Sequence, residues 1–152
     1  TVAPPVEFGS WAATSTATVA DGTYTAIAWN ETIEATPGLT IASGSRVTTT
    51  VAGVHHIEAA AAWTVNTVKV RQIMLRKNSA GSSSGGTLLR NVTAQATTAG
   101  LCVTALSWDM RLAAGDYLEL FRFQLTGGAL APAANDGAPA RPAVCSLRWV
   151  GL

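Results

Sequence analysis

Short segments rich in Val, Ile, Thr and aromatic residues recur along the whole chain, and Gly, Pro, Ser or Asn residues separate them. This pattern predicts β-strands divided by turns. The predicted strands cover residues 11–19, 24–29, 46–51, 54–64, 68–77, 87–95, 101–112, 117–125 and 143–150. No convincing amphipathic helix interrupts them, so the order of elements indicates an all-β sandwich or barrel.

The run Glu58–Ala62 is the one segment whose composition also suits a helix, because alanine is the best helix former. Its β-branched flanks, the upstream Gly53 and its short length favour a strand. Small alanines in a strand also allow a neighbouring backbone or subunit to approach closely. The longer connections are predicted at residues 31–45, 78–86 and 126–142.

Length and composition change this picture in one respect. The 152 residues suit a single domain over residues 1–152, in which residues 1–10 form an N-terminal arm or linker. Only 12% of the residues are charged, about half of the roughly 25% that is usual. Since charges normally keep small domains apart, this shortage indicates that another copy or another protein covers part of the surface.

Charge and hydropathy argue against two classes of partner. The one basic concentration, Lys69, Arg71, Arg76 and Lys77, points to both faces of a predicted strand, whereas a phosphate-binding patch needs its charge on one surface. We therefore expect no nucleic-acid partner. No segment reaches the roughly 18 unbroken apolar residues of a membrane span, so we expect no membrane insertion.

Three segments resemble a known family in their order and spacing. Residues 51–59 read VAGVHHIEA, with His55 where the family usually has Tyr, two residues after a Gly. Residues 75–78 read LRKN, and residues 112–120 read LAAGDYLEL. Together they are similar to the globular heads of the first complement component, within the wider tumour-necrosis-factor superfamily. The amino-acid sequences of these three segments most resemble the versions found in bacteriophage fibre and virion proteins.

This resemblance implies a jelly-roll sandwich of about ten strands that assembles as a tight homotrimer. It also implies that Cys102 and Cys145 lie in one sheet with another strand between them, too far apart for a disulfide. The expected function is a non-enzymatic virion surface protein, either a fibre or spike head or a capsid decoration protein, that serves attachment or particle stability. The alternative is a secreted complement-head or cytokine-like recognition ligand, but the sequence shows neither a Gly-x-y stalk nor a secretion signal.

Candidate chemistry is sparse. Residues 81–85 read GSSSG, which fits a nucleophile-elbow pattern, but that elbow needs a helix after it and here a strand pattern follows. Adjacent strand residues point to opposite faces, so His55 and His56 are not expected to share a metal. We expect one histidine in the core and the other in a polar layer of the interface. No cofactor is expected, although three symmetry copies of one histidine could gather an ion on a trimer axis.

Two sets of residues are predicted to make contacts. The trimer interface is expected at His56, Glu58, Ala60 and Ala62, which alternate along one strand face. Polar contacts to a host-surface receptor or to other virion proteins are expected from Asn135, Asp136 and Arg141 in the long loop 126–142. In jelly-roll order, the connections near 30–45, 65–67, 96–99 and 126–142 share the end opposite the termini.

Overall fold

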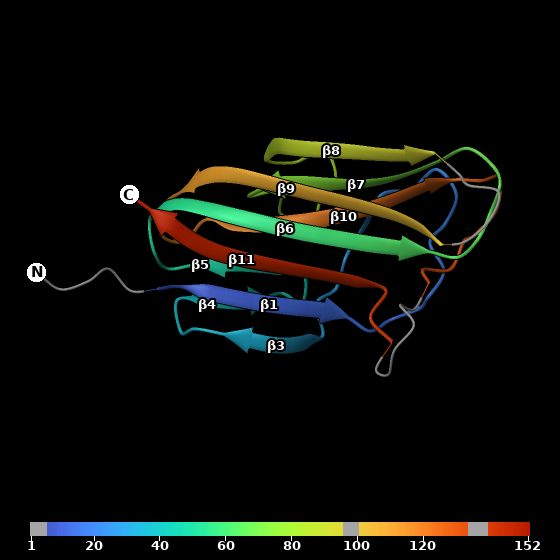
Figure 1. Cartoon of the computed structure of the whole chain (residues 1–152). Coiled ribbons are helices and arrows are strands. Elements are labelled where there is room, and N and C mark those ends of the chain that lie inside the picture. The colour runs from blue at the N-terminus through green and yellow to red at the C-terminus, as the bar shows by residue number, and fades with distance from the viewer. Residues whose placement is uncertain (1–5, 96–100, 134–139) are drawn as a thin grey trace, which may run out of the picture.

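The computed structural model describes residues 6–95, 101–133 and 140–152. Its strands form two antiparallel sheets packed face to face (Figure 1). The first sheet has the order β3-β1-β11-β6-β9, and the second has the order β4-β5-β10-β7-β8 with β2 paired to β10. The strand bounds are β1 Phe8–Ala13, β2 Thr25–Ala26, β3 Glu31–Ala35, β4 Leu39–Ala42, β5 Arg46–Thr49, β6 Gly53–Trp63, β7 Val70–Lys77, β8 Thr87–Gln95, β9 Cys102–Leu112, β10 Tyr117–Leu125 and β11 Ala143–Gly151. Within the described ranges, no helix has the length and apolarity that a membrane span requires.

The predicted jelly-roll sandwich is confirmed, and its long strands lie close to where the sequence pattern puts them. Strands β8 and β10 have the predicted bounds, and β6, β7, β9 and β11 differ by one or two residues at an end. The alanine run Glu58–Ala62 is strand, as predicted, because β6 lies between β11 and β9 and its backbone pairs with both neighbours. Packing within a sheet therefore overrides the helical preference of alanine at these positions.

Several shorter elements differ from the prediction. Residues 31–45, predicted as a loop, contain β3 and β4, because a polar edge strand such as β3 lacks the alternating apolar pattern that marks a half-buried strand. Strand β1 starts at Phe8, so Phe8–Ser10 belong to the sheet rather than to the predicted arm over residues 1–10. It ends at Ala13, and the predicted strand 24–29 shortens to β2.

The apolar core follows the two-residue alternation of strands. On β6, Ile57, Ala59 and Ala61 face the second sheet, and on β10, Leu118 and Leu120 face the first. The core cluster consists of Trp11, Ala13, Ile27, Trp29, Leu39, Val47, Ile57, Ala59, Ala61, Ile73, Leu75, Leu106, Met110, Leu112, Leu118, Leu120, Ala143, Cys145 and Leu147. Every second residue of the first sheet consequently projects from its other side.

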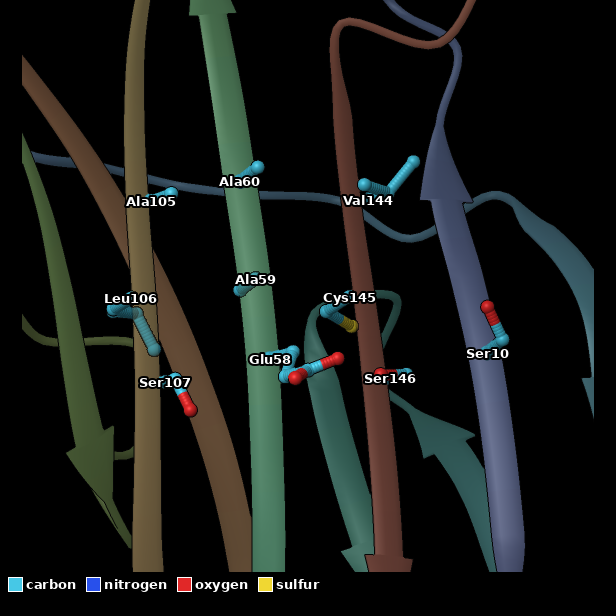
Figure 2. Close-up of a pocket in the computed structure, with 10 residues that line it drawn as sticks. All are labelled: Ser10, Glu58, Ala59, Ala60, Ala105, Leu106, Ser107, Val144, Cys145 and Ser146. Carbon is cyan, nitrogen blue, oxygen red and sulfur yellow. The ribbon is translucent and has the colours of Figure 1, made fainter.

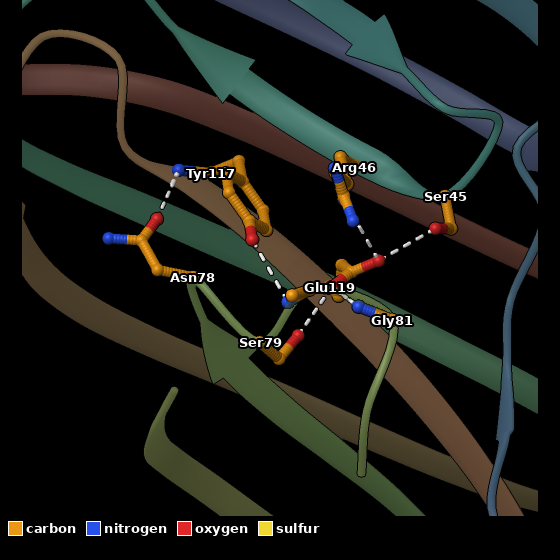
Figure 3. A network of polar contacts seen from close by, with 8 residues as sticks. Ser45, Arg46, Asn78, Ser79, Gly81, Tyr117 and Glu119 are labelled. Carbon is orange, nitrogen blue, oxygen red and sulfur yellow. Dashed lines mark hydrogen bonds and ion pairs between the residues drawn. The ribbon is translucent and has the colours of Figure 1, made fainter. Parts of the chain in front are cut away.

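Two of the sequence segments that carry the resemblance meet in space. The Asn78 amide nitrogen donates to Asp116 Oδ1 at 2.8 Å, and Lys77 Nζ lies 3.4 Å from Asp116 Oδ2. The Asn78 side-chain oxygen accepts a hydrogen bond from the Tyr117 backbone N–H at 3.0 Å (Figure 3). Gly115 has a φ of 89°, a backbone conformation that favours glycine in the turn. The end of β7 is thus fastened to the start of β10 by side chains.

Close packing at the start of β6 explains the glycine and the histidine of the remaining segment, residues 51–59. Gly53 has a φ of 145°, and a Cβ there would collide with the Trp149 indole and the Gly151 carbonyl. His55 is fully buried, and its ring nitrogens lie 3.2 Å from Thr49 Oγ1 and 3.2 Å from the Gly53 carbonyl. Burial lowers the pKa of His55, which favours the neutral ring. A neutral histidine with two partners therefore fills a core position, as the sequence predicts for one of the two histidines.

Cys102 and Cys145 are free and buried, which confirms the prediction of unpaired thiols. Strand β6 lies between their strands β9 and β11, which is the arrangement that the resemblance implies. Burial raises the pKa of the Cys145 thiol, so this group stays protonated and packs as a small apolar side chain.

The connections are only partly arranged as predicted. Thr64 Oγ1 donates to the Ala131 carbonyl at 2.9 Å, so the connections near 65–67 and 126–142 do meet at one end of the sandwich. The turn at Thr36–Gly38 is instead next to Glu7, beside which the end of β11 also lies. The prediction for 30–45 is wrong because this segment contains two strands rather than one loop. The connection at 96–99 lies outside the described residues.

Candidate assembly site on the first sheet

The outward side of the first sheet, called the open face here, carries small and weakly polar side chains. It comprises Ser10, His56, Glu58, Ala60, Val103, Ala105, Ser107, Asp109, Val144, Ser146 and Arg148, which alternate with core residues along β1, β6, β9 and β11. Val103 is 50% exposed although it is apolar. No described element of this chain packs over the middle of this face, where the side chains point away from the core (Figure 2).

A depression of about 520 Å³ lies on the open face. Figure 2 shows its lining across four neighbouring strands, with Ala60 and Ala105 on β6 and β9 and Val144 and Ser10 on β11 and β1. The depression exists because alanine and serine side chains are short, so the surface lies close to the backbone of the sheet. A second chain could approach this backbone closely.

A polar cluster adjoins the depression. His56 Nδ1 lies 2.5 Å from Asp109 Oδ1, and His56 Nε2 lies 3.2 Å from Ser107 Oγ and 3.4 Å from Glu58 Oε1. Register produces the cluster, since His56 pairs with Asp109 and Glu58 pairs with Ser107 across β6 and β9. A second hollow of about 300 Å³ is lined by His56, Ser107, Asp109 and Trp108.

The contacts Asp109–His56–Ser107 have the order of acid, base and hydroxyl in a hydrolase triad. Hydrolysis also requires donors aimed at a developing oxyanion. The N–H groups of β6 and β9 lie in the plane of the sheet, whereas these side chains project perpendicular to it. Glu58 also competes for the histidine nitrogen that would serve the hydroxyl. The described contacts therefore amount to a hydrogen-bonded cluster of four side chains on the open face.

The structure brings together three of the four residues predicted for the trimer interface. His56, Glu58 and Ala60 share the open face, while Ala62 is only 3% exposed. The Ala62 carbonyl accepts a hydrogen bond from the Ala133 N–H at 3.0 Å, because residues 131–133 cross that end of β6. Sequence reasoning missed Ser107 and Asp109. The sequence indicates that both side chains lie on the same face of β9, but only the pairing of β9 with β6 places them beside His56.

The residues predicted to bind a partner fall into two groups. Asn135 and Asp136 lie outside the described residues. Arg141 pairs with Glu31 of β3, with Nη2 to Oε1 at 2.6 Å and Nε to Oε2 at 2.8 Å. The hydrogen bond from Arg141 lowers the pKa of Glu31. Arg141 is therefore engaged within its own chain.

A second polar site, which the sequence did not predict, lies on the outer side of the second sheet around Glu119 (Figure 3). The buried Glu119 carboxylate accepts hydrogen bonds from Ser79 Oγ at 2.5 Å, Gly81 N–H at 2.8 Å and Ser45 Oγ at 2.8 Å, and Arg46 Nε lies 3.5 Å away. Burial opposes its ionisation, but these hydrogen bonds and Arg46 hold the pKa of Glu119 below its usual value. The network fixes the Gly/Ser-rich segment 79–85, which is a loop as predicted.

Comparisons with known proteins identify the fold. No protein-family model matches the chain, and no curated protein matches it in sequence. Among solved structures, murine APRIL is similar with a TM-score of 0.68 and 11% identity, over 96% of this chain and 100% of that chain. Eiger TNF from S. frugiperda gives 0.66 and 13%, over 97% and 94%. The globular domain of the zebrafish complement 1qA protein gives 0.62 and 14%, over 95% of each chain.

The chain therefore has the jelly-roll fold seen in tumour-necrosis-factor-like and complement-head proteins, and the resemblance drawn from three sequence segments is confirmed for the fold. The bacteriophage connection stays a prediction. At identities of 11–14%, the likeness shows a shared arrangement of strands and nothing finer.

Proposed function

We propose that this chain is a non-enzymatic, homotrimeric recognition module that assembles through its open face. The observation that carries the proposal is the open face itself, which spans several strands and is lined by alanine, serine and valine. A face of this kind in water leaves apolar surface unburied, and a second copy would bury it. The low charged fraction of 12% supports the same conclusion.

A threefold arrangement is supported by the resemblance to the tumour-necrosis-factor superfamily, which implies a homotrimer. The polar cluster suits such an interface, since buried polar groups are tolerated where they are hydrogen-bonded. His56, Glu58, Ser107 and Asp109 already contact one another, so a neighbouring copy could cover them without leaving each group unpaired.

The setting that we propose is the surface of a bacteriophage particle, as a fibre or spike head or as a decoration protein that contacts other virion proteins or a host-surface receptor. The resemblance of the three sequence segments to those of bacteriophage fibre and virion proteins supports this setting. A second candidate is a secreted recognition ligand, and the likeness to Eiger TNF and murine APRIL favours it. An antibody against the trimer would label intact phage particles in electron microscopy only in the first case.

Sedimentation equilibrium at micromolar concentration tests the assembly. The wild type should sediment with three times the 15.6 kDa chain mass. Ala60→Arg should give monomers, because a long charged side chain overpacks a close interface. The matched control is Ala42→Arg at an exposed position of β4 in the other sheet, which should stay trimeric. A stable, folded wild-type monomer would contradict the proposal.

A further inference from the structure

Two arginine side chains lie between the sheets without an acidic partner in the part of the chain that the structure describes. Arg71 on β7 is 0% exposed and Arg122 on β10 is 7% exposed. Neither takes part in any of the ion pairs among the described residues. Buried arginines are rare unless a carboxylate or another anion accompanies them.

Strand alternation places both side chains on the inward side of the second sheet. Leu118 and Leu120 belong to the core, and Arg122 follows them two residues further along β10. Arg122 pairs with Ile73, and Gln124 pairs with Arg71 across β10 and β7. The two arginines are therefore diagonal neighbours on one face, with Cβ atoms about 7 Å apart.

The polar atoms around Arg122 are already occupied. Arg71 Nη1 donates to the Val68 carbonyl at 3.0 Å, and its Nη2 donates to the Asn66 carbonyl at 3.1 Å. Gln124 Nε2 donates to two backbone carbonyls, and Gln124 Oε1 accepts from Thr126 Oγ1 at 2.7 Å. Arg122 Nε and Nη1 are buried and have no hydrogen-bond partner. The side chain is thus an unmatched donor.

The charge matters more than the missing hydrogen bonds. Burial lowers the pKa of Arg122, but a guanidinium is not deprotonated in proteins. A buried, unpaired charge is strongly unfavourable, and the second guanidinium nearby adds repulsion. A trapped water molecule could accept the N–H groups of Arg122, but it would leave the positive charge uncompensated. An anion satisfies both requirements.

We propose that Arg122 binds a small monatomic anion of the chloride class between the sheets, with Arg71 adding positive potential. The neighbouring Ile73 and Leu120 are fully buried and offer no donors, which suits a weakly hydrated spherical ion better than phosphate or a carboxylate. All of these residues belong to one chain, so the anion site does not depend on the proposed trimer or on any partner.

Chloride binding can be measured on the intact wild-type protein. Dilute protein should broaden the ³⁵Cl NMR line of sodium chloride, and bromide should reverse the broadening by competition. The Tm should rise with the logarithm of the chloride concentration once that exceeds the Kd, by about 5–10 °C at a hundredfold excess over the Kd. Sodium gluconate at equal ionic strength should not give this rise, because gluconate is too large for the site.

Two variants locate the effect. Arg122→Met removes the charge at similar length and should abolish both the line broadening and the Tm rise. Arg90→Met, at an exposed arginine on β8, should leave both unchanged. If Arg122→Met fails to fold, bromide-soaked wild-type crystals should show an anomalous peak beside the Arg122 guanidinium. The proposal would be overturned if chloride had no effect beyond that of gluconate on the wild type, if the effect persisted in Arg122→Met, or if the anomalous peak lay elsewhere only.

Discussion

The two sheets present their outward faces in opposite ways. On the second sheet, β2 pairs beside β10, the Tyr24 ring lies against the Phe123 ring with 4.6 Å between centroids, and the segment 79–85 closes over Glu119. On the first sheet, the open face has no such cover from the described residues. Strand alternation produces an outward face on each sheet, so the difference lies in the connections. One face is completed within the chain, and the other is the face that we propose a second chain covers.

The same contrast holds for buried charge. The carboxylate of Glu119 has donors from two loops and one arginine, whereas the His56 cluster on the open face keeps Glu58 and Asp109 about two-thirds exposed. A network that is complete in the monomer should contribute to monomer stability. A network that is half in water should contribute little until something covers it.

Replacement of Glu119 should give the largest effect. Glu119→Ala leaves the Ser79 hydroxyl, the Gly81 N–H and Arg46 without their acceptor, and we expect a loss of about 3 kcal/mol in the free energy of unfolding. Glu34→Ala, at an exposed position of β3, is the control and should cost less than about 0.5 kcal/mol. Urea unfolding of both variants measures the difference.

The pH dependence identifies the cause. The pKa of Glu119 is lowered in the folded state, so its ionised form stabilises the protein above the unfolded-state value near 4.5. This stabilisation is lost as the pH falls through the folded-state pKa. The gap between the wild type and Glu119→Gln should therefore be full at pH 7 and shrink below pH 4.5. A gap that is constant with pH would mean that shape, not charge, accounts for the loss.

The His56–Asp109 pair should respond to assembly. In a monomer, the coupling energy of a pair whose side chains are 18% and 68% exposed should stay below about 1 kcal/mol. We expect a double-mutant cycle with His56→Gln and Asp109→Asn to give at least about 1 kcal/mol more in the trimer, where the pair loses its water. The monomeric Ala60→Arg background supplies the comparison. Equal coupling in both backgrounds would show that this part of the face remains in water.

Local patterns predicted the long strands and the fold because they depend on alternation that is visible in one segment. Strand β10 alternates between apolar and polar residues over part of its length, and β8 begins directly after the Gly85–Gly86 pair. The segments around Asn78 and Asp116 carry residues that are typical of turns. Strand β3 was missed because an exposed edge strand needs no apolar face. Its position is set by pairing with β1, which no local pattern encodes.

The candidate site shows the same limit. The alternation of His56, Glu58 and Ala60 on one strand could be predicted, because it depends on a single segment. The contacts of His56 with Ser107 and Asp109 depend on which strand lies beside β6 and in which register. The position of Arg122 was even harder to predict, since a charged residue in a strand normally suggests an outward position. Only the core positions of Leu118 and Leu120 reveal that it points inward.

The smallest effect is expected at the edge of the first sheet, where Arg141 pairs with Glu31. Both side chains are about one-third exposed, so solvent screens the pair, although its two parallel hydrogen bonds favour it over an ordinary surface ion pair. We expect the coupling energy from a cycle with Arg141→Gln and Glu31→Gln, measured by urea unfolding at pH 7, to be the smallest of the three effects.

This cycle also decides whether Arg141 acts as the sequence predicts. If Arg141 serves to hold β3 against the segment after the long loop, Arg141→Gln and Glu31→Gln should change stability by similar small amounts and leave attachment to a partner unchanged. If Arg141 contacts a partner, Arg141→Gln should weaken attachment while Glu31→Gln, which frees the guanidinium, should not. Arg141→Lys separates charge from geometry, because lysine keeps the charge but cannot make the two parallel bonds. We expect the first outcome, since the guanidinium already has a carboxylate within its own chain.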